Sequence, residues 1–242
     1  MKDDRDIEED LHPSVDDYLH TGTKVGLSAI PGIGGIIAEC FSAIVPPAIQ
    51  KRRDEWLIEI YYRLKALESK IEGFKIENLS KNDHFIDTLV QATQIAMRTH
   101  NKEKIEYLRN AVITSSITPS VEESEQMFFL NLIDGYSPWH LKLLHFLSDP
   151  RKYGETHGVK YPEWSMGGLG TVIEFTFPEM KNNHSLYDQI VEQMIQDGLL
   201  QKGMYLHAVM TANGMFASRT TKLGIRFLNY ITAQKTHNGN MQ

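Results

Sequence analysis

Apolar residues recur with a helical period along most of the chain. Between residues 51 and 72 they occupy every third or fourth position, at Trp56, Ile60, Leu64, Leu67 and Ile71. Residues at this spacing fall on one face of a helix, and the glycine at position 73 is a typical helix stop. The intervening positions are mostly charged, as expected for a face in contact with water. The pattern therefore predicts a helix over 51–72 that packs into a core.

Further helices are indicated by capping residues at the start of each apolar-periodic stretch. The expected caps are Asn82 or Asp83 for a helix to about 98, Asn101 for one to about 113, Ser120 with Glu123, and Ser137 before Pro138. Such residues satisfy backbone N–H groups that have no partner in the first turn, and proline is well placed there. The joints between these stretches are short, so we expect residues 21–136 to form an antiparallel helical bundle.

The last third of the chain has a different pattern. Residues 149–170 have no helical period and predict a loop, whereas 171–177 alternate in polarity and predict a short strand. Ser185 with Asp188 predicts a cap for a helix over 185–196. The next stretch predicts a β-hairpin that turns at 212–214, and Thr220 or Thr221 predicts the cap of a final helix.

This C-terminal order resembles a known DNA-binding architecture. The stretch IVEQMIQDGLL, then an aromatic-bearing hairpin and TTKLGIRFLNYI, is similar to the winged-helix ending of many bacterial regulators. The expected fold class is therefore mainly α, with an N-terminal helical bundle followed by a C-terminal winged-helix domain (α plus a small β-hairpin) over 137–232. We expect a disordered tail at 233–242.

A glycine-rich apolar segment at 25–49 precedes the basic triplet Lys51, Arg52 and Arg53. One interpretation is a short buried core helix, because the apolar run is shorter than a membrane span. A second is a segment that inserts conditionally into membranes, opposed by the cost of about 2.5–3.5 kcal/mol for a carboxylate at the helix centre. A third, a phosphate-binding glycine loop, lacks the Gly-Lys-Ser/Thr signature.

The front half also resembles helical membrane-acting effectors of bacterial defence and cell-death systems. On that interpretation the basic triplet holds anionic lipid. The residues that would govern insertion or oligomerisation are Gly32, Gly34, Gly35 and Glu39.

Charge distribution argues against simple nucleic-acid binding. The formal net charge is −6, from 31 acidic and 25 basic residues, and residues 1–20 alone hold eight acidic and two basic ones. The imbalance therefore lies in an acidic tail over 1–20, and the body has no basic field. If the winged helix reads DNA, the contacts would come from Gln189, Gln193, Lys202, Arg219 and Lys222. The candidate recognition helix is acidic, which disfavours phosphate contact.

No catalytic, metal or cofactor signature is present in the sequence. Cys40 is the only cysteine and lies in an apolar run, and the ten histidines lack metal-ligand spacing. We therefore expect no enzyme activity and no cofactor. No secretory leader precedes the chain, so we expect the cytoplasm, with the inner-membrane surface as an alternative. The expected function is a bacterial effector or regulator of phage-defence or abortive-infection type that binds a protein partner or itself. The alternative is a DNA-binding transcriptional regulator.

Overall fold

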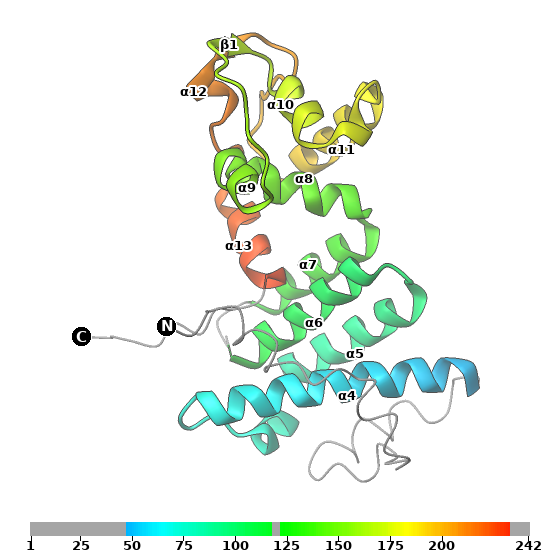
Figure 1. Ribbon diagram of the computed structural model, residues 1–242. Helices are drawn as coiled ribbons and strands as arrows, with labels where there is room; N and C mark the ends of the chain where they lie inside the picture. Colours follow the sequence, from blue (N-terminus) through cyan, green and yellow to red (C-terminus); the bar gives the residue numbers. More distant parts are fainter. Residues whose placement is uncertain (1–46, 118–121, 233–242) are drawn as a thin grey trace, which may run out of the picture. The chain divides into compact units, whose positions relative to one another are not determined.

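The computed structural model describes residues 47–117 and 122–232, and this part of the chain is mainly helical (Figure 1). The chain divides into two compact units, Met1–Ile58 and Glu59–Gln242. The acidic tail, the segment up to residue 46 and the C-terminal tail lie outside the described residues, so the expectations for them stay predictions.

Ten α-helices, two short 3-10 helices and one two-stranded sheet follow one another along the described residues. The α-helices are α4 (Pro47–Lys70), α5 (Asp83–Arg98), α6 (Lys102–Ile117), α7 (Glu123–Gly135), α8 (Pro138–Ser148), α9 (Pro150–Thr156), α10 (Leu169–Thr176), α11 (His184–Gln196), α12 (Ala212–Met215) and α13 (Lys222–Ile231). The 3-10 helices are η2 (Ile76–Lys81) and η3 (Pro178–Met180), and the strands are β1 (Met166–Gly167) and β2 (Met210–Thr211).

Helix α4 confirms the predicted apolar stripe. Trp56, Ile60, Leu64 and Leu67 are all buried, while Ile71 lies just past the helix end and is half-buried. Gly73 has a φ of +81°, a left-handed conformation that glycine adopts without the Cβ clash of other residues.

Helices α5, α6 and α7 lie side by side, as predicted for the bundle (Figure 1). The Asn82 side chain accepts a hydrogen bond from the Phe85 N–H, and the Asn101 side chain accepts one from Lys104 N–H. Both predicted caps are therefore confirmed. The predicted cap at Ser120 lies outside the described residues, and the structure has Glu122 at the N-cap of α7.

The start of α8 also confirms its prediction. Ser137 is the N-cap, Pro138 occupies the first turn, and His140 completes a capping box. The Nδ1 atom of His140 accepts from the Ser137 backbone N–H, which leaves Nε2–H to donate to the Gln193 side chain at 3.1 Å. This ring therefore links the α8 cap to α11.

The core of the second unit continues through a cluster of aromatic rings where α7, α8 and α13 meet. The Phe129 and Phe227 centroids are 5.2 Å apart, and Tyr136 lies edge-on to Phe227. All three side chains are buried, and the Tyr136 hydroxyl donates to Asp197 at 2.7 Å. These contacts fix α13 against the bundle.

Three predictions for the last third are wrong. The stretch 149–170 contains a helix, α9, because Asp149 caps it and Pro150 starts it. The predicted strand at 171–177 is helix α10, in which Val172, Ile173 and Thr176 share a buried face. The side chain of Ser185 makes no cap for α11.

The predicted hairpin at 200–220 is also wrong. Strand β2 pairs antiparallel with β1, with Gly167 opposite Met210, and residues 212–215 form helix α12 instead of a hairpin turn. Thr211 caps that helical turn by accepting from the Gly214 N–H. Between Leu200 and Thr220 the pairing is a single antiparallel bridge. The cap of α13 is Thr221, which confirms one of the two predicted residues.

Candidate functional site

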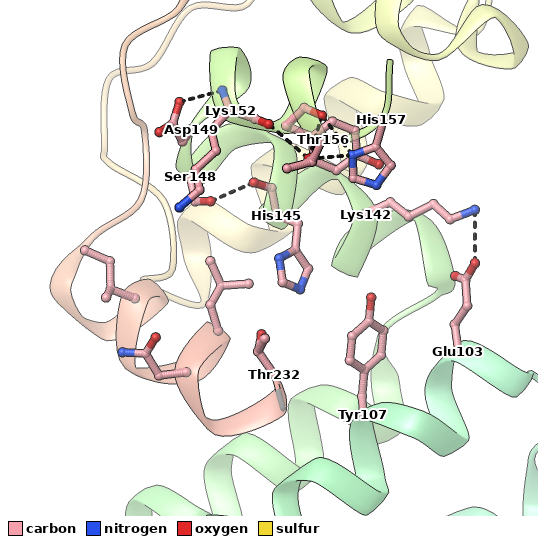
Figure 2. Close-up of a pocket in the computed structure, with 14 residues that line it drawn as sticks. Glu103, Tyr107, Lys142, His145, Ser148, Asp149, Lys152, Thr156, His157 and Thr232 are labelled. Atoms are coloured by element: carbon pink, nitrogen blue, oxygen red, sulfur yellow. Dashed lines mark hydrogen bonds and ion pairs between the residues drawn. The ribbon is translucent and has the colours of Figure 1, made fainter. Parts of the chain in front are cut away.

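The described residues of the second unit line an open cleft of about 690 Å³ (Figure 2). It has the size of small-molecule sites, which typically measure about 300–1,000 Å³. Helices α6, α8, α9 and α13 supply its walls. The lining residues are Glu103, Tyr107, Lys142, His145, Ser148, Asp149, Lys152, Tyr153, Thr156, His157, Ile225, Leu228, Asn229 and Thr232.

Tyr107 and His145 face each other across the cleft. Figure 2 shows the Tyr107 ring rising from α6 and the His145 ring descending from α8 into the same space. The rings are inclined by 23°, and their centroids are 6.1 Å apart. Within the described residues, neither the Tyr107 hydroxyl nor the His145 ring nitrogens have a hydrogen-bond partner.

Both groups are uncharged at neutral pH. Burial, with a smaller effect of nearby His157, lowers the pKa of His145 below its usual 6.5. Burial and the negative charge of Glu103 raise the pKa of Tyr107 to about 12. A neutral imidazole donates one hydrogen bond and accepts one, and a protonated phenol can do the same.

Glu103, Lys142 and Asp149 make contacts within the protein, whereas the ammonium of the exposed Lys152 has no ion pair among the described residues. The Lys142 ammonium lies 3.3 Å from a carboxylate oxygen of Glu103 (Figure 2). Asp149 accepts from the Lys152 backbone N–H at the start of α9. The far wall is aromatic, because the Tyr153 and His157 rings stack with their centroids 3.9 Å apart.

A second polar cluster lies on α10, α11 and the loop that follows α11. The Nε2 atom of His184 lies 2.6 Å from Glu174, and that of His207 lies 2.9 Å from Asp188. The buried Tyr187 donates its hydroxyl to Glu174 at 3.0 Å. Each imidazole is thus oriented by one carboxylate.

The predicted membrane residues lie only partly within the described chain. Gly32, Gly34, Gly35 and Glu39 lie outside it. In the basic triplet, Lys51 is exposed and pairs with Glu55 at 3.8 Å, and Arg52 is half-buried. Arg53 is only 8% exposed and lies 3.3 Å from Asp54, so it is poorly placed to hold lipid.

Four of the five residues named for DNA contact are exposed, namely Gln189, Gln193, Lys202 and Lys222. Gln193 is engaged with His140, and the half-buried Arg219 donates to the Gly214 carbonyl at 2.7 Å. Tyr187, on the same helix as Gln189 and Gln193, is fully buried.

Sequence reasoning missed the cleft because its two central residues are on different helices. His140 and His145 lie on the same helix, but His140 contacts Ser137 and Gln193, whereas His145 enters the cleft (Figure 2). Nothing in the pattern pairs His145 with Tyr107.

Two searches of the described residues gave negative results. Within 47–117 and 122–232, no three His, Cys, Asp or Glu side chains gather where they could hold a metal ion. No helix in the same ranges is long and apolar enough to cross a bilayer.

Comparison with known proteins gives no match of significance. Neither a family model, nor a curated protein, nor a solved structure matches this chain.

Proposed function

We propose that this protein is a non-enzymatic regulator or effector, of bacterial defence type, that senses a ligand in the cleft. The observation that supports this most directly is where the cleft lies. Glu103 and Tyr107 come from the predicted bundle, whereas the other lining residues come from the predicted domain at 137–232. A ligand bound there contacts both parts of the second unit at once. If it binds one arrangement of these helices more tightly than another, it shifts the population toward that arrangement.

The C-terminal part of this proposal is a partner-binding module of winged-helix type. Helix α11, the left-handed Gly198, the bridge between Leu200 and Thr220, and helix α13 support it, because they follow one another as in the resemblance. The acidic face of α11, with Asp188 and Glu192, favours a protein partner over DNA, because phosphates are repelled by carboxylates.

The N-terminal part of the proposal rests on the sequence. The apolar segment at 25–49, rich in small residues, would insert into a membrane or self-associate when the cleft is occupied. Lys51 and Arg52 would contact anionic headgroups. The buried Arg53 is left out of this role.

The test uses the full-length protein and a variant that mimics an occupied cleft. His145→Trp places a larger ring in the cleft, and Lys160→Trp adds the same ring at an exposed position as a control. We would measure flotation and dye release with vesicles of phosphatidylglycerol and phosphatidylcholine, and oligomeric state by light scattering. The expected result is that His145→Trp changes vesicle binding or oligomeric state while Lys160→Trp behaves as wild type.

Two outcomes would contradict the proposal. If no folded variant binds vesicles or changes its oligomeric state, the effector function fails. If the wild type is instead retained on duplex DNA in a strongly salt-dependent way, the protein is the DNA-binding regulator. Lys51→Gln with Arg52→Gln should weaken vesicle binding, whereas Lys70→Gln at the exposed end of α4 should not.

A further inference from the structure

We infer that the cleft selects an uncharged, planar ring that carries a hydrogen-bond donor beside an acceptor, the chemistry of a nucleobase-like heterocycle. This inference rests on the proposed function, since it names the class of ligand that the cleft would sense. It is argued from Tyr107 and His145, which enter the cleft from opposite walls (Figure 2).

The side chains of Tyr107 and His145 have hydrogen-bonding groups that a ligand can use. The Tyr107 hydroxyl and both His145 ring nitrogens lack partners among the described residues. Partly buried polar groups gain from a ligand that satisfies them, and a ligand that leaves them unpaired is penalised. The two imidazole nitrogens point in diverging directions, so one of them together with the Tyr107 hydroxyl meets the donor and the acceptor of the ligand ring.

The charge of the cleft argues against an ionic ligand. The Lys142 ammonium is already neutralised by Glu103 at 3.3 Å, and the Asp149 carboxylate caps α9. The lowered pKa of His145 keeps that ring neutral at pH 7, so it supplies no counter-charge to an anion. The ammonium of the lining residue Lys152 has no ion pair among the described residues, but it is exposed to water, where an ion pair contributes little. A charged ligand would therefore lose its hydration with little compensation.

The shape and surface of the cleft favour a flat ligand. Tyr107, His145, Tyr153 and His157 present ring surfaces, and Leu228 adds an aliphatic one. Aromatic pairs are favourable when offset-stacked or edge-to-face at about 4.5–7 Å between centroids. A planar ring can therefore stack on these surfaces while its edge reaches the two open polar groups.

The test measures binding of small probes to the full-length protein by isothermal titration calorimetry at pH 7.5. Adenine and cytosine are the neutral planar probes, benzoate is the planar anion, benzylamine is the planar cation and toluene is the apolar ring. The expected result is binding of at least one neutral base and at least tenfold weaker binding of the other three.

Two variants assign the binding to the proposed residues. Tyr107→Phe and His145→Phe keep an aromatic ring but remove the hydrogen-bonding atoms, so each should weaken base binding by about 3- to 10-fold. Tyr205→Phe removes a hydroxyl at an exposed tyrosine outside the cleft and should leave binding unchanged.

The inference is overturned if benzoate or benzylamine binds more tightly than the bases, if no base binds better than toluene, or if both cleft variants bind as wild type does. These outcomes are separate from a failure of the proposed function, because His145→Trp is judged by vesicle binding and oligomeric state without any probe. Circular dichroism of each variant confirms that it is folded.

Discussion

The imidazole rings of His184 and His207 stack with their centroids 5.4 Å apart and 19° between their planes. Each ring also holds a carboxylate at its Nε2 atom, Glu174 for His184 and Asp188 for His207. His207 lies on the loop after α11, and Asp188 lies on α11 itself. The contact between His207 and Asp188 therefore holds this loop against α11.

Removing the carboxylate behind His207 should loosen the loop. Asp188→Asn replaces the carboxylate that hydrogen-bonds the His207 ring with a weaker partner, so the nearby Gly170 amide, which donates to the Leu206 carbonyl at 2.8 Å, should exchange faster with deuterium. The loss of global stability should stay below about 1 kcal/mol, because both partners are substantially exposed. Asp87→Asn on the exposed face of α5 is the control, and equal exchange in both variants would refute the fastening role.

Phe227 should be one of the costliest positions for truncation. It is fully buried and contacts Phe129 and Tyr136, so Phe227→Ala leaves a cavity where α7, α8 and α13 meet. We expect a loss of about 3–5 kcal/mol in the free energy of unfolding, measured by urea denaturation. Ile225→Ala, two residues away but 48% exposed, should cost less than about 1 kcal/mol. Similar losses for both would mean that α13 is not packed as described.

Two glycines in helices should respond oppositely to alanine. At Gly224 an added Cβ would overlap the Leu199 carbonyl oxygen, a backbone atom, whereas at Gly135 nothing lies within 4 Å. Gly224→Ala should therefore destabilise the protein by about 1–3 kcal/mol despite the better helix propensity of alanine. Gly135→Ala should be neutral or slightly stabilising. Thermal unfolding of both variants checks this, and a stable Gly224→Ala protein would contradict the close approach of α13 to residue 199.

Stability should fall as the pH drops below about 6.5. Burial lowers the pKa values of both His140 and His145 in the folded protein. Between 6.5 and each folded pKa, the unfolded chain binds more protons than the folded one, so acidification favours unfolding. Each histidine contributes at most about 1.4 kcal/mol per pH unit.

Chemical denaturation at pH 7.5, 6.5 and 5.5 measures the change in the free energy of unfolding with pH. His140→Gln and His145→Gln each remove one titrating ring and should make that change smaller. His84→Gln, on the exposed start of α5, is the comparison. If neither His140→Gln nor His145→Gln changes how stability depends on pH, these two rings are not the source of that dependence.

Local signals in the sequence predicted much of the helical architecture. Asn82, Asn101, Ser137 and Thr221 were identified as caps because a cap needs only its own next three residues. The mainly helical class follows from the same signals.

The failures occur where distant residues decide the conformation. The β-branched residues Val172 and Ile173 favour a strand, but burial of one face makes them helical, and the Thr176 hydroxyl bonds back to the Val172 carbonyl. Likewise, Tyr107 and His145 become a site only because α6 and α8 place them on opposite walls of one cleft. No spacing along the chain predicts that these two residues lie close together.

The pairing of β1 with β2 has a consequence for the order of folding. Gly167 and Met210 are opposite each other, although α10, η3 and α11 lie between them in the chain. Helices α5 and α6, by contrast, are consecutive and joined by a short connection. Contacts between neighbouring segments form quickly, whereas closing a long loop first costs chain entropy. We therefore expect the α5–α6 hairpin to assemble early and the small sheet to close last, which makes the segment between its strands the part of the chain most exposed to proteases during synthesis.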